Sequence, residues 1–113
     1  MNDKCLFCRI ATGEIPAKKV YEDGDVVAFQ DINPQAPTHI LIIPTEHIAS
    51  LDEVRDQALL GNLLAFARDV ARERGLAKPG YRVVVNTNAD GGQTVFHLHL
   101  HLLGGRAMRW PPG

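Results

Sequence analysis

Three of the five histidines alternate with leucine in one short segment, His97-Leu98-His99-Leu100-His101-Leu102. A glycine pair lies on each side of it, at Gly91-Gly92 and at Gly104-Gly105. Strict alternation of polar and apolar residues between glycines is typical of a half-buried β-strand. Side chains two residues apart share one face of a strand, with about 6.7 Å between neighbours. We therefore expect a row of three imidazoles on one face, and leucines facing a core on the other.

Three interpretations of this row remain open on the residues alone. Individual histidines could be buried and satisfied by backbone groups, or His-x-His could be a pair of metal ligands. The distances argue against one metal taking all three, since zinc ligands lie about 2.1 Å from the metal while the backbones of the outer histidines are about 13 Å apart. The third interpretation is a nucleophile with supporting groups.

The turn before the row favours the nucleophile. Asp90-Gly91-Gly92-Gln93-Thr94 combines two glycines with two polar side chains. Glycine lets backbone N–H groups approach a phosphate closely, and we expect the side chains of Gln93 and Thr94 to add donors. Imidazole is neutral near pH 7, so it attacks phosphorus without repelling an anionic substrate. The combination indicates a phosphate ester or phosphoramidate as the substrate.

The rest of the chain predicts an α+β fold. Asp23-Gly24-Asp25 separates two strand-like segments, residues 20–22 and 26–29, and is typical of a hairpin. The apolar segment 39–44 predicts a central strand, and residues 81–86 predict a strand that forms a hairpin with the histidine segment. Ser50-Leu51-Asp52-Glu53 resembles a capping box, so we expect a long helix from there to Gly75. A short helix is expected near Phe7 to Ile15.

The segment His97 to Leu103 resembles the His-φ-His-φ-His-φ-φ motif of the histidine triad (HIT) superfamily, where φ is apolar. The flanking segments 90–95 and 103–113 are similar to the histidine triad nucleotide-binding (HINT) branch, and so is Phe29 to His39. The resemblance covers Phe7 to Gly113. It implies one HIT domain over residues 1–113, an antiparallel five-stranded sheet with one long and one short helix, and a homodimer that continues the sheet.

The resemblance also implies an activity, the hydrolysis of purine nucleoside phosphoramidates such as adenosine 5′-phosphoramidate, without a catalytic cofactor. His99 would attack the α-phosphorus and form a nucleotidyl-histidine that water then cleaves. The implied catalytic residues are His99, His101, His97, Thr94 and His39. The implied nucleotide-binding residues are Asp31, Ile32, Asn86, Gly92, Gln93, Thr94, Val95, His99, His101, Phe7, Ile10, Ile15, Phe29 and Trp110.

Several of these residues also have ordinary structural interpretations. Asp31 could cap a turn instead of binding the ribose hydroxyls, and Asn86 could form a turn instead of contacting phosphate or ribose. His39 could be a satisfied structural histidine instead of an outer hydrogen-bond partner of His101. Phe7, Ile10 and Ile15 could be core residues, wall the base pocket, or do both. In the resembled branch Trp110 reaches the active site of the partner subunit.

Cys5-Leu6-Phe7-Cys8 is a C-x-x-C pair, which is half of a zinc site, a redox pair, or two buried thiols. His47 and His97 are available as further ligands, and the resemblance implies zinc on Cys5, Cys8, His47 and His97. A four-coordinate closed site of this kind is structural.

Composition excludes other classes. At 113 residues with a net charge of −1, the chain suits one domain and shows no basic surface for nucleic acid. It has no apolar run of about 20 residues and no signal-like N-terminus, so we expect a cytoplasmic protein that does not enter membranes. Alternative functions are dinucleoside polyphosphate hydrolysis, nucleotide-binding regulation with incidental turnover, and metal-dependent hydrolysis.

Overall fold

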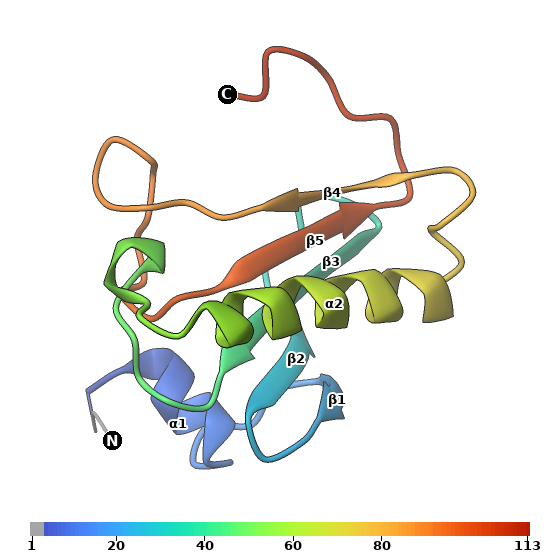
Figure 1. The fold of residues 1–113 in the computed structure, drawn as a ribbon. Coiled ribbons are helices and arrows are strands. Elements are labelled where there is room, and N and C mark those ends of the chain that lie inside the picture. The colour runs from blue at the N-terminus through green and yellow to red at the C-terminus, as the bar shows by residue number, and fades with distance from the viewer. Residues whose placement is uncertain (1–3) are drawn as a thin grey trace.

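Five strands form one antiparallel sheet, and two helices pack on its opposite faces (Figure 1). The computed structural model describes residues 4–113, so the first three residues of the predicted domain lie outside it. The elements are α1 (Leu6–Ala11), β1 (Lys19–Glu22), β2 (Val26–Gln30), β3 (Thr38–Pro44), the 3₁₀ turn η1 (Leu51–Glu53), α2 (Gln57–Glu73), β4 (Tyr81–Val84) and β5 (Leu100–Gly104). The strand order is β1-β2-β3-β5-β4, which confirms the predicted α+β fold with a five-stranded sheet.

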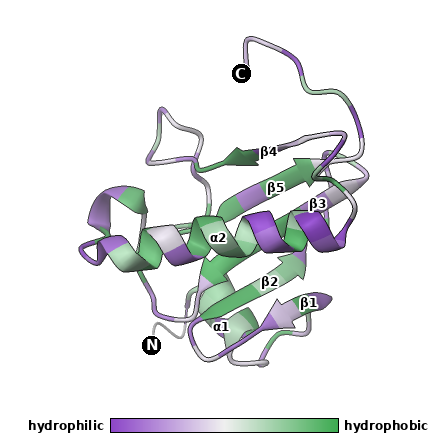
Figure 2. Cartoon of the chain, turned by 45° about the vertical axis from the view of Figure 1, so that its right-hand side comes forward, coloured by the Kyte–Doolittle hydropathy of each residue, from purple (hydrophilic) through white to green (hydrophobic). Residues whose placement is uncertain are grey.

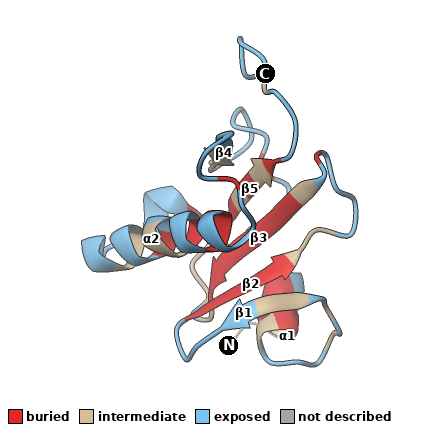
Figure 3. Cartoon of the chain, turned by 90° about the vertical axis from the view of Figure 1, so that its right-hand side faces the viewer, coloured by how far each residue is buried: buried red, intermediate tan, exposed pale blue. Residues whose placement is uncertain are grey.

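The two faces of the sheet have separate cores because side chains alternate along each strand. On one face, Ile40 and Ile42 of β3 and Leu100 and Leu102 of β5 pack against α2. On the other face, Leu41 and other residues of β2 and β3 pack against α1. Figure 2 shows the apolar strands behind the mixed surface of α2, and Figure 3 shows β2 and β3 as the most buried strands. The helices thus cover the sheet from both sides.

The long helix starts later than the sequence predicts. Ser50 is buried, but its side chain makes no capping hydrogen bond, and residues 51–53 form only a 3₁₀ turn. The backbone is extended again at Val54, which packs against the core on the α2 side of the sheet. Asp56 is the actual N-cap, and its carboxylate accepts a hydrogen bond from the Ala58 N–H at 3.0 Å. The predicted capping box is therefore wrong, whereas the predicted end is confirmed by Gly75, which has a φ of +75°.

The β5 strand is also shorter than the row of histidines. It begins at Leu100, so His101 lies in the strand, whereas His97 lies in a bend and His99 in the segment between them. The ladder with β3 ends at the pair Ile42 and Leu100. Pro44 has no N–H to continue it, and its carbonyl oxygen accepts a hydrogen bond from the His97 ring at 2.8 Å. The prediction that all three histidines share one strand is wrong for this reason, although Leu98, Leu100 and Leu102 are buried as predicted.

The two edges of the sheet differ. The β1 edge is short and has an irregular register between Lys19 and Tyr21, a feature that discourages further pairing. β4 pairs with β5 on one side, and no strand of residues 4–113 pairs with its other side. Beyond β5 the chain runs past β4, where Arg82 Nη2 donates to the Arg109 carbonyl at 2.8 Å, and Trp110 is 82% exposed.

No helix within residues 4–113 is long and apolar enough to cross a membrane.

Candidate active site

His99 is held by the backbone of its own segment. Its Nδ1 lies 2.7 Å from the carbonyl oxygen of His97. A carbonyl can only accept a hydrogen bond, so Nδ1 carries the proton, and in the neutral ring Nε2 then keeps a free lone pair. The ring is buried, and the edge of Phe7 contacts it at a centroid distance of 5.0 Å. The result is an oriented imidazole with one nitrogen available for attack.

His39 and His101 form a directed hydrogen-bond chain. The Gln35 N–H donates to Nδ1 of His39 at 3.0 Å, so that nitrogen is an acceptor. His39 Nε2 therefore carries the proton and donates a hydrogen bond to Nδ1 of His101 at 2.9 Å. Neutral His101 must then carry its own proton on Nε2. The structure places His39 where the resemblance implied, as the outer partner of His101.

Burial keeps this group of histidines neutral. Desolvation, with His99 and His39 close by, lowers the pKa of His101 from 6.5 to about 4 against the opposing effect of Asp31. Burial also lowers the pKa of His99, although the hydrogen bond to the His97 carbonyl opposes it. The pKa of His39 is lowered by burial and raised in part by Asp31. At pH 7 the rings are thus neutral donors and acceptors, which suits attack on an anionic phosphorus centre.

Asp31 follows β2 and faces the histidine chain. Its Oδ2 lies 3.5 Å from His39 Nε2, while its Oδ1 accepts a hydrogen bond from the Asn33 N–H at 2.8 Å. One oxygen therefore caps the turn, as in the structural interpretation, and the half-buried carboxylate also borders a cavity of about 580 Å³. Ile32 lines the same cavity and is 98% exposed, so nothing within residues 4–113 covers it. This cavity is wide enough for part of a nucleoside.

The loop before His97 is tightly built. Gly91 approaches Thr87 so closely that an added Cβ would lie 2.4 Å from the Thr87 carbonyl oxygen. Gly92 has a φ of +85°, a conformation that favours glycine. Thr94 is exposed, with its hydroxyl free of hydrogen bonds to the rest of residues 4–113, and Asn86 is half-buried beyond β4. Thr94 and Val95 line a hollow of about 460 Å³.

Of the two predicted side-chain donors, Gln93 is the one that is not free. Its Nε2 donates to the carbonyls of Ala49 and Val95, at 2.7 and 3.1 Å, and its Oε1 accepts from the Asn88 N–H at 2.9 Å. The side chain is buried and is fully used in holding the loop. The expectation that it offers a free side-chain donor is therefore corrected, because the loop needs those bonds to keep its backbone polar groups satisfied.

The predicted apolar residues lie on the α1 face of the sheet. Phe7, Ile10 and Phe29 are buried there, and Ile15 packs partly buried against them. The rings of Phe7 and Phe29 meet edge to face at a centroid distance of 5.5 Å. They are core residues, and Phe7 also supports the nucleophile candidate through its ring contact with His99.

Cys5, Cys8, His47 and His97 converge from three distant parts of the chain. Their ligand atoms all lie within 4.8 Å of one another. His97 Nδ1 lies 3.3 Å from Cys5 Sγ and 3.5 Å from Cys8 Sγ, and His47 Nδ1 lies 3.3 Å from Cys8 Sγ. Tetrahedral zinc with Zn–S of 2.3 and Zn–N of 2.1 Å would separate S and N by about 3.6 Å.

The tautomer of His97 agrees with metal binding. Its Nε2–H donates to the Pro44 carbonyl, which leaves the Nδ1 lone pair directed at the cysteines. A ligating histidine typically donates its other N–H to a carbonyl in this way. The donor set thus fits zinc, which would supply a rigid cross-link between the N-terminal segment and the histidine loop.

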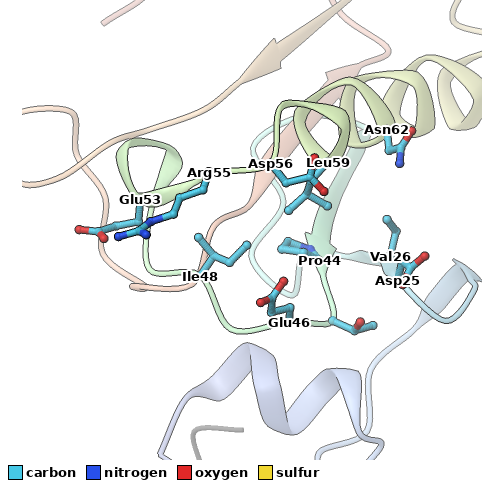
Figure 4. A pocket seen from close by; sticks show the side chains of 11 residues that line it. Asp25, Val26, Pro44, Glu46, Ile48, Glu53, Arg55, Asp56, Leu59 and Asn62 are labelled. Atoms are coloured by element: carbon cyan, nitrogen blue, oxygen red, sulfur yellow. The ribbon is translucent and has the colours of Figure 1, made fainter.

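A separate cavity of about 390 Å³ lies beside the start of α2 (Figure 4). Four carboxylates line it, those of Asp25, Glu46, Glu53 and Asp56, against one cation, Arg55. An anionic phosphate would be repelled there. None of the predicted site residues lines it, so the nucleotide site is expected on the histidine side of the sheet.

Sequence reasoning did not identify three groups that shape the site. The Gln35 N–H and the Pro44 carbonyl are backbone atoms, and their use depends on tertiary placement. Arg106 donates to the Gln35 carbonyl from Nε and Nη2, at 3.1 and 3.0 Å. The only sequence signal for Arg106 was a positively charged residue directly after Gly104-Gly105.

Residues 12–108 match the HIT domain family, and the chain belongs to that family. A HIT family hydrolase from Legionella pneumophila is 58% identical, with a TM-score of 0.95 over 97% of this chain and 100% of that one. A 14 kDa zinc-binding protein from Zea mays is 52% identical over 96% of this chain and 87% of its own. The purine nucleoside phosphoramidase of Escherichia coli is 46% identical over 96% of this chain and 92% of its own.

Proposed function

We propose that this protein hydrolyses purine nucleoside phosphoramidates, releasing a nucleoside monophosphate and an amine. The observation that supports this most directly is the 2.7 Å hydrogen bond from His99 Nδ1 to the His97 carbonyl, which leaves Nε2 free and unprotonated. The name of the Escherichia coli relative, a purine nucleoside phosphoramidase, supports the P–N bond as the target.

In the proposed first step, His99 Nε2 forms a bond to the α-phosphorus while the bond from phosphorus to the amine nitrogen breaks. The amine leaves with its electron pair and takes up a proton, which Thr94 or a triad histidine helps to deliver. In the second step water attacks the nucleotidyl-histidine, the N–P bond breaks, and nucleoside monophosphate is released.

Charge that develops on the phosphoryl oxygens needs donors that are already in place. The N–H groups of Gly92 and Gln93 already donate to the carbonyls of Ala89 and Asn88, both at 3.0 Å. We therefore assign this role to the backbone N–H groups of Thr94 and Val95 and to the Nε2–H of His101. The pKa of His101, lowered to about 4, keeps that ring neutral and hence a donor at one nitrogen only. Asp31 would accept hydrogen bonds from the ribose hydroxyls, with Asn86 near the phosphate or ribose.

Zinc on Cys5, Cys8, His47 and His97 is proposed to have a structural role. The name of the Zea mays relative records zinc binding, and the donor geometry of this chain fits that metal. Because His97 both faces the cysteines and accepts the hydrogen bond from His99, the cross-link would steady the nucleophile.

We also propose a homodimer that pairs β4 edges across a two-fold axis. Within residues 4–113 no strand pairs with the outer side of β4, and Leu64 on α2 and Trp110 beyond β5 are 55% and 82% exposed. Large apolar side chains that one chain leaves uncovered favour an interface. Trp110 would then complete the active site of the partner subunit.

The deciding experiment is a rapid quench of the protein with adenosine 5′-phosphoramidate, followed by peptide mapping of the nucleotide adduct. An adduct on His99 is expected. Parallel assays with a dinucleoside polyphosphate, with AMP alone and after chelation separate the alternatives. Faster cleavage of the polyphosphate, saturable AMP binding without cleavage, or abolition of turnover by chelators without loss of the fold would each contradict the proposal.

A further inference from the structure

Arg106, two residues beyond β5, binds the backbone of a distant turn. Its Nε and Nη2 both donate to the Gln35 carbonyl, at 3.1 and 3.0 Å, and its Nη1 donates to the Ala107 carbonyl at 3.1 Å. Within residues 4–113 the guanidinium makes no ion pair. All three of these hydrogen bonds go to backbone carbonyls, and two of them go to Gln35 in the turn formed by residues 31–37.

The same strand end contacts this turn a second time. An added Cβ at Gly105 would lie 2.8 Å from Pro37 Cβ, and Gly105 has a φ of +91°. Within the turn, Gln35 Nε2 donates to the Asn33 carbonyl at 3.0 Å. The turn is thus fixed both by its own bonds and by the end of the strand that carries His101.

The residue that Arg106 holds is the one that sets the tautomer of His39. The Gln35 N–H donates to His39 Nδ1 at 3.0 Å, which forces the proton of the neutral ring onto Nε2. Asp31 Oδ2, 3.5 Å from Nε2, favours the same arrangement. His39 Nε2–H then points to His101 Nδ1 at 2.9 Å, and so the proton of His101 is on Nε2.

We propose that Arg106 is a positioning residue for His101: by clamping Gln35 it keeps His39 and His101 in the Nε2–H tautomers. It touches none of the reacting groups itself. Without the clamp the backbone N–H of Gln35 is held less firmly against His39 Nδ1, and both tautomers of His39 become accessible. His101 then presents either a donor or an acceptor at Nε2. The kinetic consequence rests on the proposed function, whereas the tautomers do not.

The first test is ¹⁵N NMR of the histidine rings at pH 7.5, with the metal-loaded protein. The wild type should show His39 and His101 as single Nε2–H tautomers. Arg106→Ala should add the Nδ1–H tautomer at both rings, whereas Arg68→Ala, which removes an exposed arginine bound to Asp69, should leave the spectrum unchanged. Arg106→Lys keeps the charge but not the two-donor fork, and should also show the second tautomer, to a smaller degree.

The second test is kinetic. Arg106→Ala should lower kcat by about tenfold to a hundredfold, the size of effect known for residues that orient metal-ligating histidines through hydrogen bonds, with KM within about twofold. Arg106→Lys should have a kcat between those of Arg106→Ala and the wild type. Wild-type tautomers in both Arg106 variants overturn the proposal, even if stability falls. Absence of turnover in the wild type refutes the phosphoramidase function instead, and the spectra still decide the role of Arg106.

Discussion

The ring nitrogen Nδ1 of His99 donates a hydrogen bond to the carbonyl oxygen of His97 across 2.7 Å, while the His97 ring faces Cys5 and Cys8. One residue therefore belongs to two systems, with its backbone oxygen orienting the candidate nucleophile and its side chain completing the metal-ligand cluster.

Replacing His99 should abolish turnover and leave nucleotide binding intact. His99→Asn removes the lone pair that would attack phosphorus, so kcat should fall by at least about a thousandfold. The affinity for AMP, measured by calorimetry, should stay within a few fold. Turnover near the wild-type rate would refute the assignment of the nucleophile, and Arg68→Ala serves as the unaffected control.

Acid should destabilise the protein partly through His101. Its pKa in the folded state is lowered from 6.5 to about 4, so between these values the unfolded chain binds the proton more readily. The stabilisation is present above pH 6.5 and is lost as the pH falls toward 4. Urea unfolding at several pH values should show this slope, and His101→Gln should flatten it. An unchanged slope in the variant would contradict the assignment.

The metal cluster should hold about one zinc per chain. Protein purified without chelators should contain at least about half an equivalent, and Cys8→Ser, which removes one of four ligands, should retain far less. Its melting temperature should fall by about 5 °C or more, since the cross-link to the N-terminal segment is lost. If the purified wild type contained no metal and melted at the same temperature as Cys8→Ser, the four-ligand site would be excluded.

Two glycine substitutions should have opposite effects. Gly91→Ala places a Cβ 2.4 Å from the Thr87 carbonyl oxygen, so it should distort the loop, lower stability by about 2 kcal/mol and reduce turnover. Gly61→Ala, in an open position inside α2, should raise stability by about 0.5–1 kcal/mol without affecting turnover. Thermal and urea unfolding measure both. If both substitutions changed the free energy of unfolding equally, the loop at Gly91 would be shown to tolerate a side chain.

Trp110 should matter only in a dimer. Sedimentation at micromolar concentration is expected to give twice the chain mass. Trp110→Ala should keep that mass and lower kcat/KM by about tenfold, because a side chain 82% exposed in one chain would complete the partner's site. A monomeric wild type would refute the role across the interface.

The sequence predicted the strands, the hairpins and the end of the long helix because each depends on local periodicity or on a turn glycine. It also predicted the convergence of Cys5, Cys8, His47 and His97, through the family resemblance. The start of α2 was missed because Val54 packs into the core instead of continuing a helix from Ser50. The start of β5 was missed because Pro44 gives its carbonyl to the His97 ring, a contact made across 53 positions.

The long helix and the histidines lie on opposite faces of the sheet, because Leu100 and Leu102 point toward α2 while His101 shares the face of Leu41. Variation in the helix is therefore separated from the reacting groups by a layer of strands. Directed evolution could therefore introduce substitutions along α2 that change solubility or the strength of an interface without changing the reaction at the histidines.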